Sequence, residues 1–149
     1  MGSRKIFIKQ LSRNPLFKLP RYESNGAAGM DLSADIDTEV ELKPLERKLL
    51  PTGIAISLPK DIEAQIRPRS GLAIKHGITL LNTPGTIDSD YRGEIKVILI
   101  NISNSAYTVK PGDRVAQMVL SKYTQGQFVV VESLDDTNRG SSGFGSTGK

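Results

Sequence analysis

The sequence predicts an all-β sandwich or barrel, and three observations support this fold class. Turn-forming residues recur often and fairly regularly, at Pro44, Pro51, Pro59, Pro68, Pro84-Gly85 and Pro111-Gly112. Short segments rich in β-branched and apolar residues lie between them, a spacing that is typical of sandwiches and barrels. No stretch longer than two turns carries the apolar stripe of an amphipathic helix.

The expected strands follow one another along the chain. Residues 27–34 are small or apolar apart from Asp31, and this segment is expected to be a strand. Residues 62–66 alternate apolar and polar side chains, which indicates a half-buried strand. The other segments expected to be strands are 53–58, 78–81, 94–100, 115–120 and 128–131.

Two further elements and one boundary complete the expected fold. Residues 71–76 are expected to form one short helix, and residues 82–94 a β-hairpin with Gly93 near its bend. No internal repeat or linker divides the rest, so residues 1–137 are expected to be one all-β domain, a sandwich or a barrel. Residues 138–149 are rich in Gly and Ser and are expected to form a flexible C-terminal arm.

Length and composition exclude several classes of protein. The 149 residues suffice for one domain with its own core. Cysteine is absent, which excludes a disulfide framework, a thiolate zinc site, an iron–sulfur centre and a cysteine nucleophile. The single histidine, His76, excludes a multi-histidine metal site and is expected to be structural.

Hydropathy and charge limit the partners. No apolar run approaches the roughly 20 residues of a membrane span, and the first residues lack the apolar core of a secretory signal. We therefore expect a cytoplasmic protein with no membrane partner. The net charge of +4 favours anionic ligands. The basic residues do not form the dense stripe that is typical of a nucleic-acid-binding protein, so no nucleic-acid partner is expected.

The C-terminal arm carries two residues that a simple linker does not need, Arg139 and Phe144. A tail of this composition is most simply a frayed terminus, whereas an aromatic ring with a cation suits a lid over a base and its phosphates. Gly143, Gly148 and Lys149 have the spacing of a phosphate-binding loop. No Ser or Thr and no helix follow them, so an NTPase loop is not expected.

Two segments contain candidate groups for phosphate binding and catalysis. Arg69 and Ser70 are donors suited to phosphate oxygens, and Gly71 allows close approach of the backbone. Taken alone, this segment is more often an ordinary basic turn. Asp88 is a candidate general base, and Tyr91 offers a flat face for a sugar. An isolated Asp-Ser-Asp sequence is more often a solvated turn.

Asp31 needs a partner or a cation, because it lies in a small and apolar segment. Magnesium prefers oxygen ligands, but one carboxylate is not a complete site, so any metal would have to arrive with substrate phosphates. Arg114 and Gln117 are polar groups beside an apolar run. Arg114 is a candidate partner for Asp113 or for another carboxylate.

Five segments, in their order along the chain, resemble the five motifs of the trimeric dUTPases, the deoxyuridine triphosphate nucleotidohydrolases. These segments are 28–32, 69–73, 84–94, 112–117 and 139–148. The resemblance extends over about residues 22 to 149. Met30 stands where many relatives have an aromatic residue, and residues 82–84 differ from some relatives, which leaves the backbone contacts at Asn82 less well supported.

The resemblance implies a jelly-roll-like β-barrel that hydrolyses dUTP to dUMP and pyrophosphate with Mg²⁺, which keeps uracil out of DNA and supplies dUMP for dTMP synthesis. By similarity, Asp88 would activate the attacking water. Asp31 would hold magnesium through bound waters. The expected substrate-binding residues are Arg69, Ser70, Gly71, Asn82, Thr86, Ile87, Tyr91, Lys96, Gln117, Arg139, Phe144, Gly145, Ser146 and Thr147.

The resemblance also implies a homotrimer with active sites at the subunit junctions. One subunit would contribute Asp31, the Arg69 segment and Gln117, a second would contribute Asp88 and Tyr91, and a third would contribute the C-terminal arm. Three alternatives remain open at this point: a dCTP deaminase or a bifunctional deaminase–dUTPase on the same barrel, a non-catalytic dUTP sensor, and a basic nucleic-acid-binding β-domain. Ammonia release from dCTP, dUTP binding without turnover, or salt-sensitive duplex binding would distinguish them.

Overall fold

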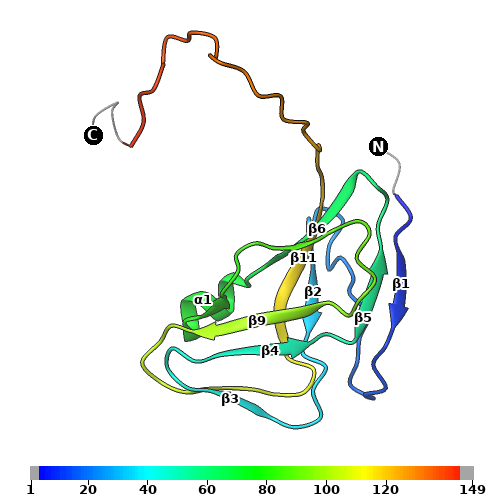
Figure 1. Cartoon of the computed structure of the whole chain (residues 1–149). Coiled ribbons are helices and arrows are strands. Elements are labelled where there is room, and N and C mark those ends of the chain that lie inside the picture. The colour runs from blue at the N-terminus through cyan, green and yellow to red at the C-terminus, as the bar shows by residue number, and fades with distance from the viewer. Residues whose placement is uncertain (1–3, 145–149) are drawn as a thin grey trace.

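The computed structural model describes residues 4–144, and its regular secondary structure in this range consists of β-strands and one short helix (Figure 1). The strands in the first half are β1 (Phe7–Gln10), β2 (Gly29–Ser33), β3 (Val40–Leu42), β4 (Arg47–Pro51), β5 (Ile54–Ser57) and β6 (Ile62–Arg67). The second half contains α1 (Ser70–His76), β7 (Ile78–Leu80), β8 (Gly85–Ile87), β9 (Lys96–Asn101), β10 (Tyr107–Val109) and β11 (Arg114–Lys122). The all-β prediction is confirmed.

Antiparallel pairing organises the described strands into sheets. The largest sheet has the order β2-β11-β6-β8, and a second has the order β4-β9-β7. β1 pairs with β5, and β10 pairs with β3. Strands distant in sequence are therefore neighbours, so that Gln117 of β11 lies opposite both Asp31 of β2 and Arg67 of β6.

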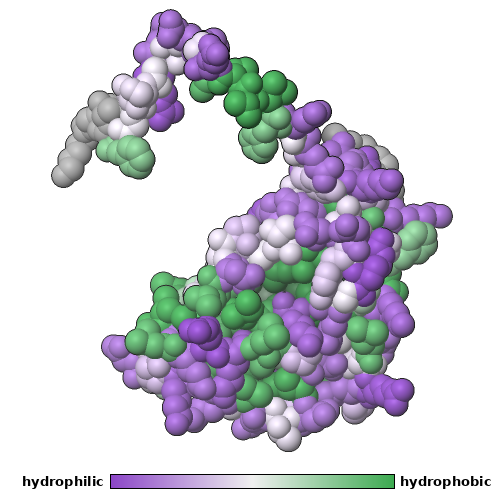
Figure 2. Space-filling view, in the orientation of Figure 1, coloured by the Kyte–Doolittle hydropathy of each residue, from purple (hydrophilic) through white to green (hydrophobic). Residues whose placement is uncertain are grey.

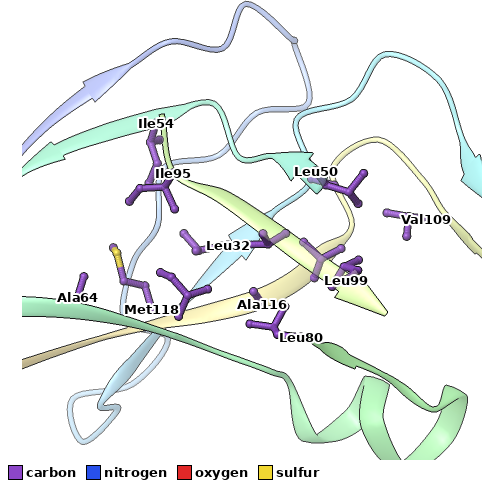
Figure 3. Close-up of a cluster of buried hydrophobic side chains, with 14 of the residues drawn as sticks. Leu32, Leu50, Ile54, Ala64, Leu80, Ile95, Leu99, Val109, Ala116 and Met118 are labelled. Carbon is purple, nitrogen blue, oxygen red and sulfur yellow. The ribbon is translucent and has the colours of Figure 1, made fainter. Parts of the chain in front are cut away.

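The core lies where the inward faces of these sheets meet. Ile62, Ala64 and Ile66 of β6 are buried and alternate with less buried residues, which confirms the predicted half-buried strand. Side chains from β2, β9 and β11 gather in the same cluster (Figure 3), including Leu32, Leu99 and Met118. This cluster fixes the strands from which the polar residues of the site project.

The expected helix is present as α1, and its end has a clear physical cause. Gly77 follows the helix with φ 63°, a left-handed conformation that favours glycine, and its N–H donates to the carbonyl of Ala73 at 3.0 Å. The strand expected over 27–34 is also present, as β2.

The hairpin expected over 82–94 is wrong. β8 pairs with β6, with Thr86 opposite Gln65, whereas β9 pairs with β4 and β7 in another sheet. The cause is burial: Ile95, Val97 and Leu99 must face the core from the second sheet. The chain between β8 and β9 therefore crosses between sheets, and this crossing segment carries Asp88 and Tyr91.

The strand expected over 128–131 is also wrong for the single chain. The chain leaves the barrel after β11 and runs outward in an extended path (Figure 1). Phe128 and Val130 are 100% and 97% exposed, so nothing in the described chain covers them. Hydrophobic residues are gathered on this outward segment (Figure 2). Within residues 4–144, no helix is long and apolar enough to cross a bilayer.

Candidate active site

A cavity of about 330 Å³ lies beside the crossing segment between β8 and β9, and we call it the crossing cavity. It is lined by six residues predicted from the sequence: Asn82, Thr86, Ile87, Asp88, Tyr91 and Lys96. It is also lined by residues that the sequence did not single out for the site, namely Leu49, Ile66, Leu80, Gly85, Glu94, Val97 and Ile98. The cavity thus combines apolar walls with a few polar groups, a common arrangement in small-molecule sites.

Tyr91 lines this cavity, and hydrogen bonds to its own segment fix both its backbone and its hydroxyl. Its N–H donates to the carbonyl of Asp88 at 3.1 Å, and its hydroxyl donates to the carbonyl of Glu94 at 2.9 Å. A Cβ added at Gly93 would lie 2.4 Å from the Tyr91 hydroxyl oxygen. Gly93 is therefore required by the close approach of the Tyr91 ring.

Glu94 fixes the far end of the crossing segment. Its carboxylate accepts a hydrogen bond from the backbone N–H of Gly53 at 3.1 Å and lies 3.8 Å from the Lys96 ammonium. Glu94 stands in the motif-like segment, but its role there depends on Gly53, which is 41 residues away along the chain. Sequence spacing gave no signal for that contact.

Asp31 has two arginine partners. Arg69 Nε donates to Asp31 Oδ1 and Arg114 Nη1 donates to Asp31 Oδ2, both at 3.0 Å. Arg69 Nη1 also donates to the backbone carbonyl of Arg114 at 3.0 Å. The expectation that Asp31 needs a partner is confirmed, and Arg114 pairs with this carboxylate rather than with its neighbour Asp113.

Gln117 lies next to this cluster on β11. Its side-chain amide donates to the carbonyl of Pro68 at 2.9 Å, directly before Arg69. A Cβ at Gly29 would come within 2.4 Å of Gln117 Oε1, so the glycine on β2 makes room for this side chain. The structure thus brings Asp31, Arg69 and Gln117 together, as the sequence predicted.

Ser70 and Gly71 begin α1 and are exposed. A Cβ at Gly71 would meet no atom of the described chain within 4 Å. Packing inside the chain therefore does not require glycine at this position.

A larger basic cleft of about 680 Å³ adjoins Asp31 and Arg114. Its other charged lining residues, Lys18, Arg21 and Glu23, were not predicted, because they lie in a loop without a motif. The basic cleft and the crossing cavity share no lining residue. The single chain therefore holds Asp31 and Asp88 in separate places.

The arm residues are separate from both sites. Arg139 Nε donates to the carbonyl of Ser142 at 3.0 Å within the arm, and Phe144 is fully exposed. The chain after β11 runs outward from the barrel (Figure 1), and residues 139–144 belong to this stretch of the sequence. Three further predicted residues, Gly145, Ser146 and Thr147, lie outside the described residues.

The donor set around Asp31 contains one carboxylate and two arginines. Among residues 4–144, no three His, Asp or Glu side chains are grouped closely enough to hold a metal ion. Each Asp31 oxygen accepts one arginine hydrogen bond and keeps a further lone pair for a water molecule. The chain thus offers one carboxylate toward Mg²⁺, and the other ligands would have to come with an anionic ligand.

His76 lies outside these groups. Its ring packs against Tyr107, with centroids 4.9 Å apart. Burial raises the pKa of the Tyr107 hydroxyl above its ordinary value. The two rings pack the end of α1 against the barrel, in keeping with a structural role.

Comparisons with known proteins give a consistent result. The family model described as dUTPase matches residues 16–148. A deoxyuridine 5′-triphosphate nucleotidohydrolase of Fusobacterium nucleatum is 58% identical over 146 residues, covering 98% of this chain and 99% of the relative. One from Cytophaga hutchinsonii is 61% identical over 131 residues, covering 88% and 85%. The solved dUTPase of Staphylococcus bacteriophage 80alpha with dUPNHPP has a TM-score of 0.88 at 23% identity, covering 99% of this chain and 100% of that chain.

Proposed function

The chain belongs to the dUTPase family of dUTP-hydrolysing enzymes, and we propose that it cleaves dUTP to dUMP and pyrophosphate by attack of water on the α-phosphorus, with Asp88 as the general base. One observation carries this proposal: Asp88 and Tyr91 line a single cavity, on a segment held by hydrogen bonds to Asp88 and Glu94. A carboxylate beside a nucleotide pocket is suited to orient and deprotonate a water molecule.

Uracil would be recognised mainly by backbone groups of residues 82–96. β8 is the last strand of its sheet, so one of its edges is not paired with another described strand, and its residues line the crossing cavity. A fixed row of donors and acceptors rejects cytosine, because the wrong base would leave buried polar groups unpaired. The methyl group of thymine would clash, and Tyr91 under the deoxyribose would exclude a 2′-hydroxyl.

The triphosphate would bind near Arg69, Ser70, Gly71 and Gln117. Hydrogen bonds within the chain use two N–H groups of Arg69, and a guanidinium has five such donors. Asp31 would hold Mg²⁺ through bound waters. Magnesium, when bound, neutralises charge on the triphosphate. The residues named above would hold the triphosphate in the orientation that in-line attack of water on the α-phosphorus requires.

The complete site would require a homotrimer. Asp88 and Asp31 lie in separate cavities, and Arg139 and Phe144 lie on the outward arm. If three subunits met, one would supply the Asp31 group, a second the Asp88 group and a third the arm. Phe144 would then stack on uracil, while Arg139, Gly145, Ser146 and Thr147 would contact the phosphates and close the site.

The exposed apolar segment 128–131 supports this assembly. Consecutive exposed apolar residues of this kind mark an interaction surface in a protein of this size. On this proposal residues 138–149 remain a separate arm, and the preceding apolar residues pack on a neighbouring subunit. The described chain offers them no partner of its own.

A panel of nucleotides tests the proposal. Purified protein with Mg²⁺ should release pyrophosphate from dUTP and much less from dTTP, dCTP or UTP. In ¹⁸O-labelled water the label should enter dUMP, because attack is at the α-phosphorus. Label in pyrophosphate would contradict that step. Ammonia release from dCTP would indicate a deaminase, and dUTP binding without pyrophosphate would indicate a sensor.

A further inference from the structure

Tyr123 directly follows β11, at the point where the chain leaves the barrel. Its hydroxyl donates to the backbone carbonyl of Lys60 at 2.5 Å and lies 3.1 Å from Ser89 Oγ. A phenol hydroxyl has one hydrogen to donate, and Tyr123 donates it to the Lys60 carbonyl. The Ser89 hydroxyl must therefore be the donor in the contact with Tyr123. The hydroxyl of Tyr123 thus joins Ser89 to the turn between β5 and β6.

The Lys60 end of this connection is firmly held. Tyr123 N–H donates to the carbonyl of Asp61 at 3.3 Å, and the Ile62 N–H donates to that of Pro59 at 3.0 Å. Arg4 donates to the Asp61 carboxylate at 2.5 Å, and this hydrogen bond holds the pKa of Asp61 below its ordinary value. Tyr123 therefore connects Ser89 to a fixed part of the barrel.

The Ser89 end belongs to the turn that carries Asp88. This turn has open space on two sides, because Asp88 lines both the crossing cavity and a second cavity of about 390 Å³. The second cavity is also lined by Ser89, Tyr123 and Gln125. Hydrogen bonds hold this turn: Arg92 Nη1 donates to the Ser89 carbonyl at 2.8 Å, and the Tyr123 hydroxyl contacts the Ser89 side chain.

We propose that Tyr123 is a positioning residue that fixes the Asp88 turn through Ser89. This inference rests on the proposed function, since it gives a role to the carboxylate at position 88. A misplacement of about 1 Å in a catalytic group costs up to roughly 100-fold in rate. Loss of one of several tethers should cost less than that, on the order of 10-fold. The effect should fall on kcat rather than on KM, because Tyr123 does not line the crossing cavity.

The test compares Tyr123→Phe, Ser89→Ala and the double variant in the full-length protein. Tyr123→Phe keeps the ring and removes both hydroxyl contacts, and it should lower kcat on the order of 10-fold with KM for dUTP nearly unchanged. Ser89→Ala should lower kcat in the same direction. The double variant should be no slower than Tyr123→Phe, because both changes break the same connection.

Tyr22→Phe is the matched control, since its hydroxyl has no hydrogen-bond partner within residues 4–144 and it should leave kcat unchanged. An unchanged kcat in Tyr123→Phe, or full additivity in the double variant, would overturn the inference while leaving dUTP hydrolysis intact. A fall in melting temperature without a change in kcat would show a purely structural role. Failure of the wild-type protein to hydrolyse dUTP would overturn the proposed function and this inference together.

Discussion

Asp31 shows how a single carboxylate can organise a binding site. Its two oxygens each accept an arginine hydrogen bond at 3.0 Å, from Arg69 after β6 and from Arg114 at the start of β11. The side chain is 23% exposed, so solvent weakens these ion pairs and their net contribution to stability is small. Their main effect is to hold Arg69 in one orientation, which is the preorganisation that the proposed phosphate binding would need.

The role of Asp88 is tested by Asp88→Asn, which keeps the size and removes the base. Turnover of dUTP should fall by about 10²–10⁴-fold, the usual contribution of a general base. The Kd for a non-hydrolysable dUTP analogue should change little, because the proposed nucleoside contacts are made by the backbone of residues 82–96 and by Tyr91. Calorimetric titration and steady-state pyrophosphate release measure the two effects separately. Unchanged turnover would remove Asp88 from this role.

Gly93→Ala tests the position of Tyr91. The new Cβ would lie 2.4 Å from the Tyr91 hydroxyl oxygen and 2.6 Å from Cζ, so the ring must move. Because Tyr91 is proposed to exclude the ribose 2′-hydroxyl, the ratio of kcat/KM for dUTP to that for UTP should fall by roughly 10-fold. Gly26→Ala is a matched control, since its Cβ would meet no described atom within 4 Å. An unchanged ratio in Gly93→Ala would show that the ring does not set sugar specificity.

At the scale of elements, Asn101 ties the end of β9 to two other segments. It is fully buried, and its amide N–H groups donate to the carbonyls of Leu42 and Ser105 at 2.9 and 2.8 Å. Its carbonyl oxygen accepts hydrogen bonds from the backbone N–H and the hydroxyl of Ser103, at 2.9 and 2.8 Å. One side chain thus replaces the backbone pairing that this irregular loop lacks.

Asn101→Leu should therefore lower the free energy of unfolding by about 3 kcal/mol, because several buried polar groups lose their partners. Asn104→Leu, at an exposed position in the same loop, should change it by less than about 0.5 kcal/mol. Chemical denaturation measures both values. The kcat of folded Asn101→Leu should equal that of the wild type, since the residue lines neither the crossing cavity nor the basic cleft. An equal loss of stability in both variants would contradict the special role of Asn101.

Strands were predictable where burial alternates regularly, as in β6 and β9. They were not predictable where it does not: every residue of β1 is exposed, and β3 has only three residues. Residues 128–131 have the composition of a strand, but the chain itself supplies nothing to cover them. The composition of a segment indicates that it can form a strand. It does not indicate whether the strand that pairs with it lies in the same chain.

The site shows the same division. The motif-like segments placed Asp31, Arg69 and Gln117 together, because β2, β11 and β6 are adjacent in one sheet. Lys18 in the basic cleft and the contact between Ser89 and Tyr123 were missed. The place of Lys18 and the contact between Ser89 and Tyr123 both depend on where a loop lies in three dimensions. The sequence around these residues carries no pattern that indicates those positions.

At the scale of the whole molecule, magnesium should affect activity and not folding. Among residues 4–144 no cluster of acidic or histidine side chains could hold a metal tightly. A chelator should therefore slow dUTP hydrolysis strongly and leave the melting temperature of the substrate-free protein unchanged. Excess Mg²⁺ should restore the rate. A large fall in melting temperature on chelation would show that the metal is part of the fold, contrary to this expectation.

The last prediction separates assembly from closure of the site. Removing residues 138–149 takes away Arg139 and Phe144 but leaves the apolar residues 128–131. This variant should remain a trimer while kcat/KM falls on the order of 100-fold, because the groups that would clamp the substrate are lost. Removing residues 126–149 also takes away the apolar segment and should give smaller, inactive species, because the proposed contact of this segment with a neighbouring subunit would be lost.

A point substitution in the full chain makes the test sharper. Val130 is 97% exposed in the single chain, so Val130→Ser should be harmless if the segment stays in solvent. If the segment packs on a neighbouring subunit, the same change should weaken the trimer by about 1–3 kcal/mol for the loss of one buried apolar side chain. Sedimentation over a concentration series measures this difference. A trimer unaffected by Val130→Ser and by removal of residues 126–149 would require contacts made by the barrel alone. Asp31 and Asp88 lie in separate cavities of one chain. A fully active monomer would therefore contradict the proposal that the active site is shared between subunits.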